Sequence, residues 1–170
     1  MKIRLKTLLL LLSCSVMVLA ADVVWYDGTQ PVDYEVQGRT APVVEKALEM
    51  FRSDMALVTG REAVACKGGT IQVYQLDANG GAVSKLRRMG IPVDSLIGRL
   101  DAFYIGIGTP QPSTPKNRHI IVVGSNGRGT AYGLLELSRK AGVSPWVWWG
   151  DVLPHSRSRL TLPADYTTLQ

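Results

Sequence analysis

The feature that most constrains this chain is an uninterrupted apolar strand that runs directly into a helix. Residues 119–123 read His-Ile-Ile-Val-Val, with no polar alternation after the first position. Such a strand is typical of the centre of a sheet that is covered on both faces. Apolar residues at helical spacing follow over residues 127–141, with Ser125 or Asn126 as the expected cap and Gly142 as the expected stop. The pattern predicts an α/β domain.

A second amphipathic helix is predicted over residues 41–59, where apolar side chains recur every three or four positions. Thr40 is the expected N-cap, Pro42 suits the first turn, and Gly60 supplies a left-handed stop.

Shorter patterns predict strands over residues 71–74 and 101–107 and a short helix over residues 81–89. The strand at 101–107 is expected to pair with residues 119–123 as a hairpin, because a proline-rich turn separates the two. The element order predicts a two-layer α/β domain in which a mixed β-sheet packs against two main helices. We expect this domain to span residues 21–153, and residues 154–170 to form an exit segment that leaves it.

Residues 1–20 have the pattern of a secretory signal peptide, with three basic residues, an apolar stretch and small residues before a cut after Ala20. We therefore expect a secreted or periplasmic protein with no membrane anchor after cleavage. Cys14 leaves open the less favoured alternative of a lipoprotein. If Cys14 is removed, Cys66 remains alone, so the mature chain can form no internal disulfide.

Charge gives little reason to expect nucleic acid as a partner. The formal charge of +5 includes Lys2, Arg4 and Lys6 of the signal peptide, and without them 16 basic residues face 14 acidic ones. Binding to a phosphate backbone needs a stronger basic excess. The glycine-rich turn at residues 124–130 lacks the spacing of nucleotide-binding motifs. Its glycines are better explained by a relaxed turn and by close approach of the following helix to the sheet.

Three tryptophans in four positions, Trp146, Trp148 and Trp149, are the least usual feature. Large aromatic rings in a terminal segment need something to cover them, either another protein domain or the apolar face of a sugar. If the segment is extended, Trp146 and Trp148 would point to one side and Trp149 to the other. Asp151 follows directly.

No catalytic or metal site can be assembled from the remaining polar residues. Asp101, His119, Asp151 and His155 form no recognisable acid–base constellation, and two lone histidines with one cysteine lack metal-ligand spacing. We therefore expect no catalytic residue, no metal ligand and no cofactor.

Residues 120–138 and 142–152 carry the patterns G-S-x-x-R-G-T-x-Y-G and G-V-S-P-W-x-W-W-x-D-V. These resemble the amino-terminal region of glycoside hydrolase family 115, which contains xylan α-1,2-glucuronidases. Residues 57–60 and 96–103 are also similar to that family. Asn126 and Gly127 stand where the family commonly has an acidic and a basic residue.

The resemblance implies an accessory domain similar to the one that precedes the barrel in family 20 hexosaminidases and family 67 glucuronidases. It implies that catalysis belongs to a (β/α)₈ barrel absent from this chain. Arg128, Trp146, Trp148, Trp149 and Asp151 are then candidates for the domain–barrel seam or the edge of the substrate cleft, with Arg128 positioning the turn beside the tryptophans. The expected partners are that barrel and a glucuronoxylan oligosaccharide. The alternative is a free-standing carbohydrate-binding module that uses residues 146–149.

Overall fold

The computed structural model describes residues 21–108 and 118–170. The predicted signal peptide and its Cys14 lie outside the described residues. In chain order the elements are β1 (Val23–Tyr26), β2 (Asp33–Gln37), α1 (Pro42–Thr59), β3 (Val64–Ala65), β4 (Ile71–Gln75), α2 (Ala82–Arg88), η1 (Val93–Ser95), β5 (Phe103–Gly108), β6 (His119–Gly124), α3 (Gly127–Ala141), η3 (Pro145–Trp148), β7 (Leu160–Leu162) and β8 (Thr167–Leu169). Within this part of the chain, no helix has the length and apolar character that a membrane crossing requires.

The main sheet has six strands in the order β3-β2-β4-β6-β5-β8. Strands β2, β3, β4 and β6 are parallel, whereas β5 is antiparallel to both β6 and β8. The sheet is therefore mixed, as predicted, and the apolar strand β6 lies in its interior. The predicted hairpin is also confirmed, with Ile105 opposite Val122.

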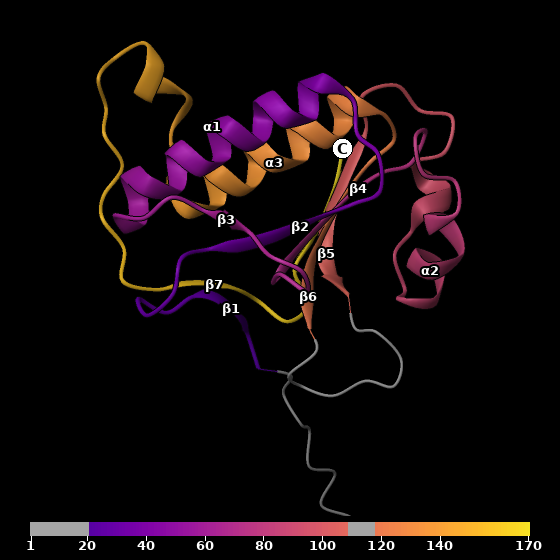
Figure 1. Ribbon diagram of the computed structural model, residues 1–170, viewed down its shortest axis with the longest axis horizontal. Helices are drawn as coiled ribbons and strands as arrows, with labels where there is room; N and C mark the ends of the chain where they lie inside the picture. Colours follow the sequence, from indigo (N-terminus) through magenta and orange to yellow (C-terminus); the bar gives the residue numbers. More distant parts are fainter. Residues whose placement is uncertain (1–20, 109–117) are drawn as a thin grey trace, which may run out of the picture.

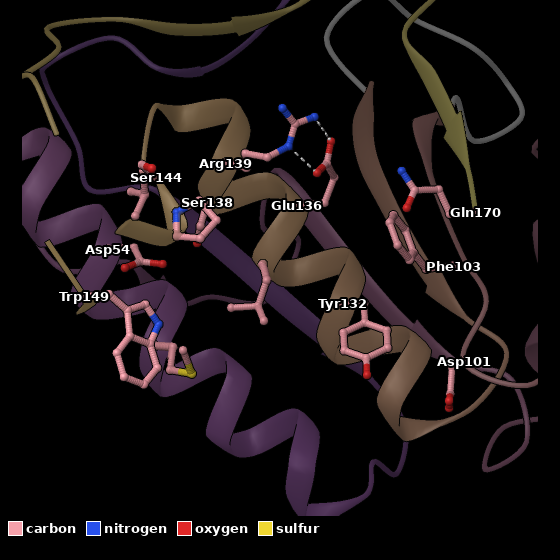
Figure 2. A pocket seen from close by; sticks show the side chains of 14 residues that line it. Asp54, Asp101, Phe103, Tyr132, Glu136, Ser138, Arg139, Ser144, Trp149 and Gln170 are labelled. Atoms are coloured by element: carbon pink, nitrogen blue, oxygen red, sulfur yellow. Dashed lines mark hydrogen bonds and ion pairs between the residues drawn. The ribbon is translucent and has the colours of Figure 1, made fainter. Parts of the chain in front are cut away.

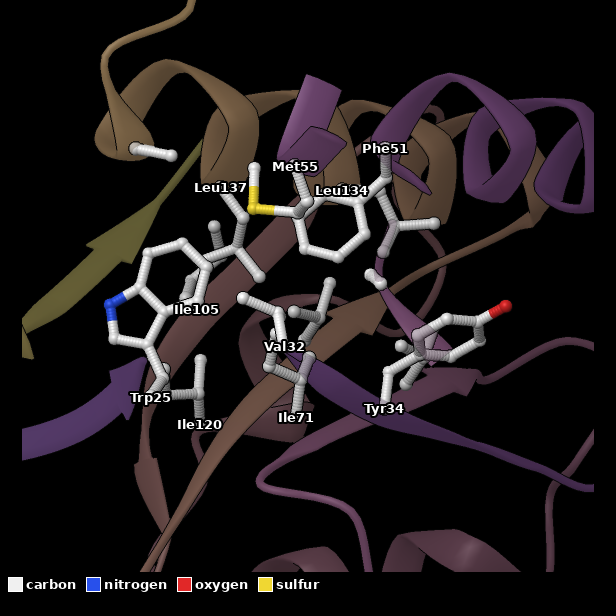
Figure 3. Close-up of a cluster of buried hydrophobic side chains, with 14 of the residues drawn as sticks. Trp25, Val32, Tyr34, Phe51, Met55, Ile71, Ile105, Ile120, Leu134 and Leu137 are labelled. Atoms are coloured by element: carbon white, nitrogen blue, oxygen red, sulfur yellow. The ribbon is translucent and has the colours of Figure 1, made fainter. Parts of the chain in front are cut away.

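Helices α1 and α3 lie side by side on one face of this sheet (Figure 1). The apolar stripe of α1 is buried between α3 and the strands, and Figure 3 shows Phe51 and Met55 packed above Ile71 and Ile120. The predicted Thr40 cap is wrong. Ala41 occupies the N-cap with no side-chain cap, and its backbone N–H instead donates to Gln75 Oε1 at 2.8 Å. The start of α1 is thus anchored to the end of β4.

Helix α3 begins and ends as the sequence predicts. The Asn126 side chain accepts a hydrogen bond from the Gly129 N–H at 2.8 Å, which satisfies one of the free amides of the first turn. Gly142 ends the helix in the left-handed conformation, with φ of 107°.

The opposite face of the sheet carries a smaller layer that the two-layer prediction did not include. Alternate residues of β4 and β6, such as Tyr74 and Ile121, point to this face. They form a second buried cluster with Leu86 of α2 and with the chain around η1. The fold class is confirmed, and α2 adds partial cover where the sequence indicates only a short polar helix.

The predicted boundary at residue 153 differs from the structure. Strand β7 pairs with β1 in a separate two-stranded sheet, and β8 adds an edge strand to the main sheet beside β5. Leu160 and Leu162 are buried in the main core. Much of the segment 154–170 is therefore part of the domain, because its alternating residues find partners far away in sequence.

Close contact between α3 and the sheet depends on glycine. A Cβ atom at Gly129 would lie 2.2 Å from the Ala102 carbonyl oxygen, and one at Gly133 would lie 2.7 Å from a Val122 methyl group. The first neighbour is backbone and cannot rotate away. The predicted role of these glycines in close helix–sheet approach is confirmed.

We expect Gly129→Ala to lower the free energy of unfolding by about 2 kcal/mol or more, because the new methyl group forces α3 away from the sheet. Gly81→Ala is the matched control, since Gly81 has helical backbone angles and a Cβ atom added there would enter open space. That control should change stability by less than about 1 kcal/mol, in the stabilising direction. Equal effects in urea unfolding would contradict this packing account.

Candidate functional site

A groove of about 490 Å³ runs across the outer side of α3 (Figure 2). Its walls come from α1, from α3, from the segment that follows α3, and from the edge of the sheet. The lining residues are Met50, Asp54, Asp101, Phe103, Tyr132, Leu135, Glu136, Ser138, Arg139, Val143, Ser144, Pro145, Trp149 and Gln170.

Trp149 stands on the rim of this groove at the end of a tight turn. Residues 145–148 form the 3-10 helix η3, in which the Ser144 hydroxyl accepts the Trp146 N–H at 3.2 Å. The segment is therefore not extended, and the alternation of rings that an extended segment would give does not occur. Ser144 and Pro145 favour the start of a short helix, a signal that was present in the sequence. The side chain of Trp148 lies outside the described part of the structure.

The chain from residue 146 to residue 153, here called the tryptophan segment, presents a series of exposed apolar side chains. Trp146 is 66% exposed and Trp149 is 86% exposed, and Val152 and Leu153 are also exposed. By contrast, Trp25 is buried in the main core. Two of the three rings predicted to need a cover, Trp146 and Trp149, are thus left uncovered by the described residues of this chain.

Arg128 does not lie beside the tryptophans. It occupies the first turn of α3, whereas η3 follows the last turn, and a helix of this length spans about 20 Å. The Arg128 guanidinium instead pairs with Asp101 Oδ2 at 2.9 Å, and the Tyr132 hydroxyl and the Asp101 charge raise its pKa. Arg128 therefore orders the end of the groove opposite Trp149.

The other polar candidates do not meet at one site. Asp151 is exposed in the left-handed conformation, with φ of 51°. His119 contacts the Gly69 carbonyl oxygen on the far side of the sheet, and His155 is exposed in the loop before β7. Among residues 21–108 and 118–170, no group of three or more histidine, cysteine or acidic side chains could hold a metal ion.

Two buried polar residues line the groove, and of these Ser138 was expected to face inward whereas the burial of Asp54 was not predicted. Asp54 of α1 is 3% exposed, and Ser138 of α3 is equally buried. Asp54 Oδ1 and Ser138 Oγ each lack a hydrogen-bond partner among the described residues. Burial raises the pKa of the Asp54 carboxyl, because the charged form loses its hydration. An acidic residue within the apolar stripe of α1 was the signal that could have found this pair.

Glu136 lies nearby in a different electrostatic setting. Arg139 donates two hydrogen bonds of 2.6 Å to its two carboxylate oxygens, and Figure 2 shows this two-pronged contact. The hydrogen bonds and the positive charge lower the pKa of Glu136. The groove thus holds three carboxyls: Asp54, whose pKa is raised by burial, Glu136, whose pKa is lowered by Arg139, and Asp101, which pairs with Arg128.

Comparison with solved structures gives a close match. A structure described as a novel family GH115 4-O-methyl-α-glucuronidase, with specificity for decorated arabinogalactans, aligns with 88% of this chain at 31% identity and a TM-score of 0.71. The resemblance to family GH115 predicted from the sequence is thereby confirmed. This chain spans 18% of the length of that enzyme.

A second solved structure, CpGH84D, aligns with 82% of this chain and 21% of its own, at 13% identity and a TM-score of 0.47. No protein-family model matches the sequence, and no curated protein does.

The buried Asp54 predicts a pH dependence of stability. Its folded-state pKa is raised above the ordinary value of 3.8, so the folded protein favours the protonated form. Stability is therefore lost as pH rises from that value through the higher folded-state pKa. We expect Asp54→Asn to raise the melting temperature at pH 7 and to change it little below the ordinary aspartate pKa.

Asp94→Asn is the control of opposite sign. Arg87 lowers the pKa of Asp94 through a hydrogen bond and its charge, so Asp94 stabilises the fold above its ordinary pKa. This control should lower the melting temperature slightly at pH 7. The account of Asp54 fails if Asp54→Asn destabilises the protein at pH 7.

Proposed function

We propose that this chain is a non-catalytic accessory domain of a secreted glycoside hydrolase that acts on polysaccharide substituted with glucuronic acid. The match to a family GH115 enzyme, and the share of that enzyme which the chain spans, support a domain that works with a larger catalytic part. Export would depend on residues 1–20. The sequence resemblance favours xylan as the substrate. The matching enzyme is specific for decorated arabinogalactans, so decorated arabinogalactan is the second polysaccharide to test.

The observation that carries this proposal is the exposure of Trp146 and Trp149. A tryptophan side chain has roughly 150–250 Å² of surface to bury, and 66% of Trp146 and 86% of Trp149 is still exposed. At about 25 cal/mol per Å², covering both rings would contribute on the order of 5–10 kcal/mol before association costs. Exposed apolar surface of this kind marks an interaction site in soluble proteins. We assign the cover to the catalytic barrel that family GH115 enzymes are expected to contain.

The groove gives further support for a non-catalytic role. Glycoside cleavage needs one carboxyl that donates a proton and a second, free carboxylate about 5–10 Å away. Glu136 is held on both oxygens by Arg139, and Asp54 is buried beneath the groove surface. Asp101, the third carboxyl that lines the groove, pairs with Arg128 through one oxygen and accepts a hydrogen bond from Asn126 on the other. None of the three is left as a free carboxylate. We therefore expect the isolated chain to release no glucuronic acid from xylan or arabinogalactan fragments.

A chimera tests the docking role most clearly. Residues 21–170 of this chain would replace the matching region of the solved family GH115 enzyme. We expect the double variant Trp146→Ser/Trp149→Ser to lower both the melting temperature and the release of glucuronic acid in the chimera, because the seam loses its apolar contact. In the isolated chain the same double variant should leave the melting temperature unchanged, since neither ring is part of the core.

Val64→Ser provides the control in both proteins, because Val64 is an exposed apolar residue on the edge strand β3. It should have no effect on the chimera. The docking role is contradicted if the tryptophan variant and the Val64 variant of the chimera have the same melting temperature and release glucuronic acid equally.

The second candidate is a free-standing carbohydrate-binding module, which is favoured by the position of Trp149 on the rim of the groove. Flat indole rings suit the apolar faces of sugars. Tryptophan fluorescence would be followed while glucuronoxylan or arabinogalactan fragments are added to the isolated chain. The docking role predicts no saturable change. A saturable change that Trp149→Phe alters and Val64→Ser does not would favour the binding module instead.

A further inference from the structure

A pocket of about 380 Å³, lined mainly by polar residues, lies on the other side of the sheet from the groove, at the corner formed by β2 and β4. Strand pairing places Glu35 beside Gln72, and Gln37 beside Tyr74, and side chains two apart on a strand share a face. Lys67, Lys85, Met89 and His119 also line this space, here called the β2–β4 pocket. Its volume is within the range of small-molecule sites.

The floor of the β2–β4 pocket is a chain of fixed polar side chains. Gln37 Nε2 donates to Gln72 Oε1 at 2.6 Å, and Gln72 Nε2 donates to the Gly69 carbonyl at 2.8 Å and to Glu35 Oε2 at 3.2 Å. The Gly68 N–H also donates to Glu35 Oε2, at 2.9 Å. Gln72 is only 5% exposed. The orientation of these groups is therefore set before any ligand arrives, which reduces the entropic cost of binding.

Tyr74 provides the observation that points to a ligand. Its side chain is 1% exposed, yet its hydroxyl has no hydrogen-bond partner among the described residues. A buried hydroxyl without a partner is uncommon in folded proteins and calls for a physical explanation. Tyr74 lines the β2–β4 pocket. Its hydroxyl oxygen is itself covered, so a ligand that supplies the missing hydrogen bond must displace the side chains over it.

The charges of the β2–β4 pocket select among ligand classes. The Glu35 carboxylate repels an anionic ligand, whereas the ammonium groups of Lys67 and Lys85 repel a cationic one. The Lys85 ammonium also lies 5.5 Å from the centre of the Tyr74 ring, so positive charge stands above the buried phenol. A neutral hydroxyl group can donate to the Glu35 carboxylate and accept from a lysine or from an amide N–H. A ligand with adjacent hydroxyl groups can therefore hydrogen-bond to both the donors and the acceptors that line the pocket.

We propose that the β2–β4 pocket binds a neutral sugar ring through the side chains of Glu35, Gln37, Tyr74 and Lys85. This site is separate from the tryptophan segment, and it stands whether or not the docking role proposed above is correct. The sheet itself forms the floor, so the site belongs to the rigid part of the fold.

The test is a titration of the full chain followed by ¹H–¹⁵N NMR. The probes are xylose, galactose and glucose as neutral sugars, with glucuronate and glucosamine as the anionic and cationic comparisons. We expect saturable shifts of the Gln37 and Gln72 side-chain amide signals with at least one neutral sugar. Glucuronate and glucosamine should bind at least several-fold more weakly.

Tyr74→Phe removes only the unpartnered hydroxyl and should weaken binding of the neutral sugar by roughly three- to tenfold, as expected for one hydrogen bond. Tyr104→Phe is the control, because Tyr104 is a second buried tyrosine on the same face of the sheet and does not line the pocket. The Trp146→Ser/Trp149→Ser variant should bind like the wild type.

Three results would each overturn the proposal. These are the absence of saturable shifts with every neutral sugar, tighter binding of glucuronate or glucosamine, and equal sugar affinity of Tyr74→Phe and the wild type. The last result would mean that the Tyr74 hydroxyl makes no hydrogen bond to the sugar.

Discussion

The approach of α3 to the sheet is the constraint on which the rest of the structure depends. Gly129 and Gly133 remove the methyl groups that would otherwise hold the helix away from Ala102 and Val122. At the preceding turn, a Cβ atom on Gly124 would lie 2.0 Å from the Thr130 amide nitrogen. The helix therefore sits at one depth and one rotation against β5 and β6. This contact positions the outer side of α3, which lines the groove. It also positions the C-terminal end of α3, which η3 follows.

This arrangement divides the domain into two functional sides. On the α1 and α3 side, the tryptophan segment and the groove present aromatic surface together with the ordered Arg139–Glu136 and Arg128–Asp101 pairs. On the α2 side, the β2–β4 pocket presents fixed amides and charges of both signs. Apolar surface without a cover suits a protein partner, whereas alternating donors and acceptors suit hydroxyl groups. The same sheet can therefore serve two interactions that do not compete.

The sequence predicted the elements whose signals are local. Helices α1 and α3 have clear apolar stripes that end at Gly60 and Gly142, and the continuous apolar run of β6 indicated an interior strand. Strand β2 was missed, although Tyr34 and Val36 alternate with polar residues, because five residues give a weak signal. Its polar side is what builds the β2–β4 pocket. The role of residues 160–169 could not be predicted, since their partners β1 and β5 are distant in sequence.

Individual site residues show the same limit. The need of Trp146 and Trp149 for a cover was predicted because three large aromatic rings stand together in a terminal segment. The prediction that Arg128 lies beside the tryptophans was wrong, because the two parts of the family pattern stand at opposite ends of α3. The buried pair Asp54 and Ser138 forms where α1 and α3 pack together, and its one local signal is the acidic residue within the apolar stripe of α1.

Solvent access to single indole rings tests the central claim most directly. Hydroxyl-radical footprinting would compare the isolated chain with the chimera that contains the catalytic part, using the buried Trp25 as an internal reference. We expect strong labelling of Trp146 and Trp149 in the isolated chain, strong protection of both in the chimera, and protection of Trp25 in each. Equal labelling of Trp146 and Trp149 in the two proteins would contradict the claim that this surface is covered by a catalytic partner.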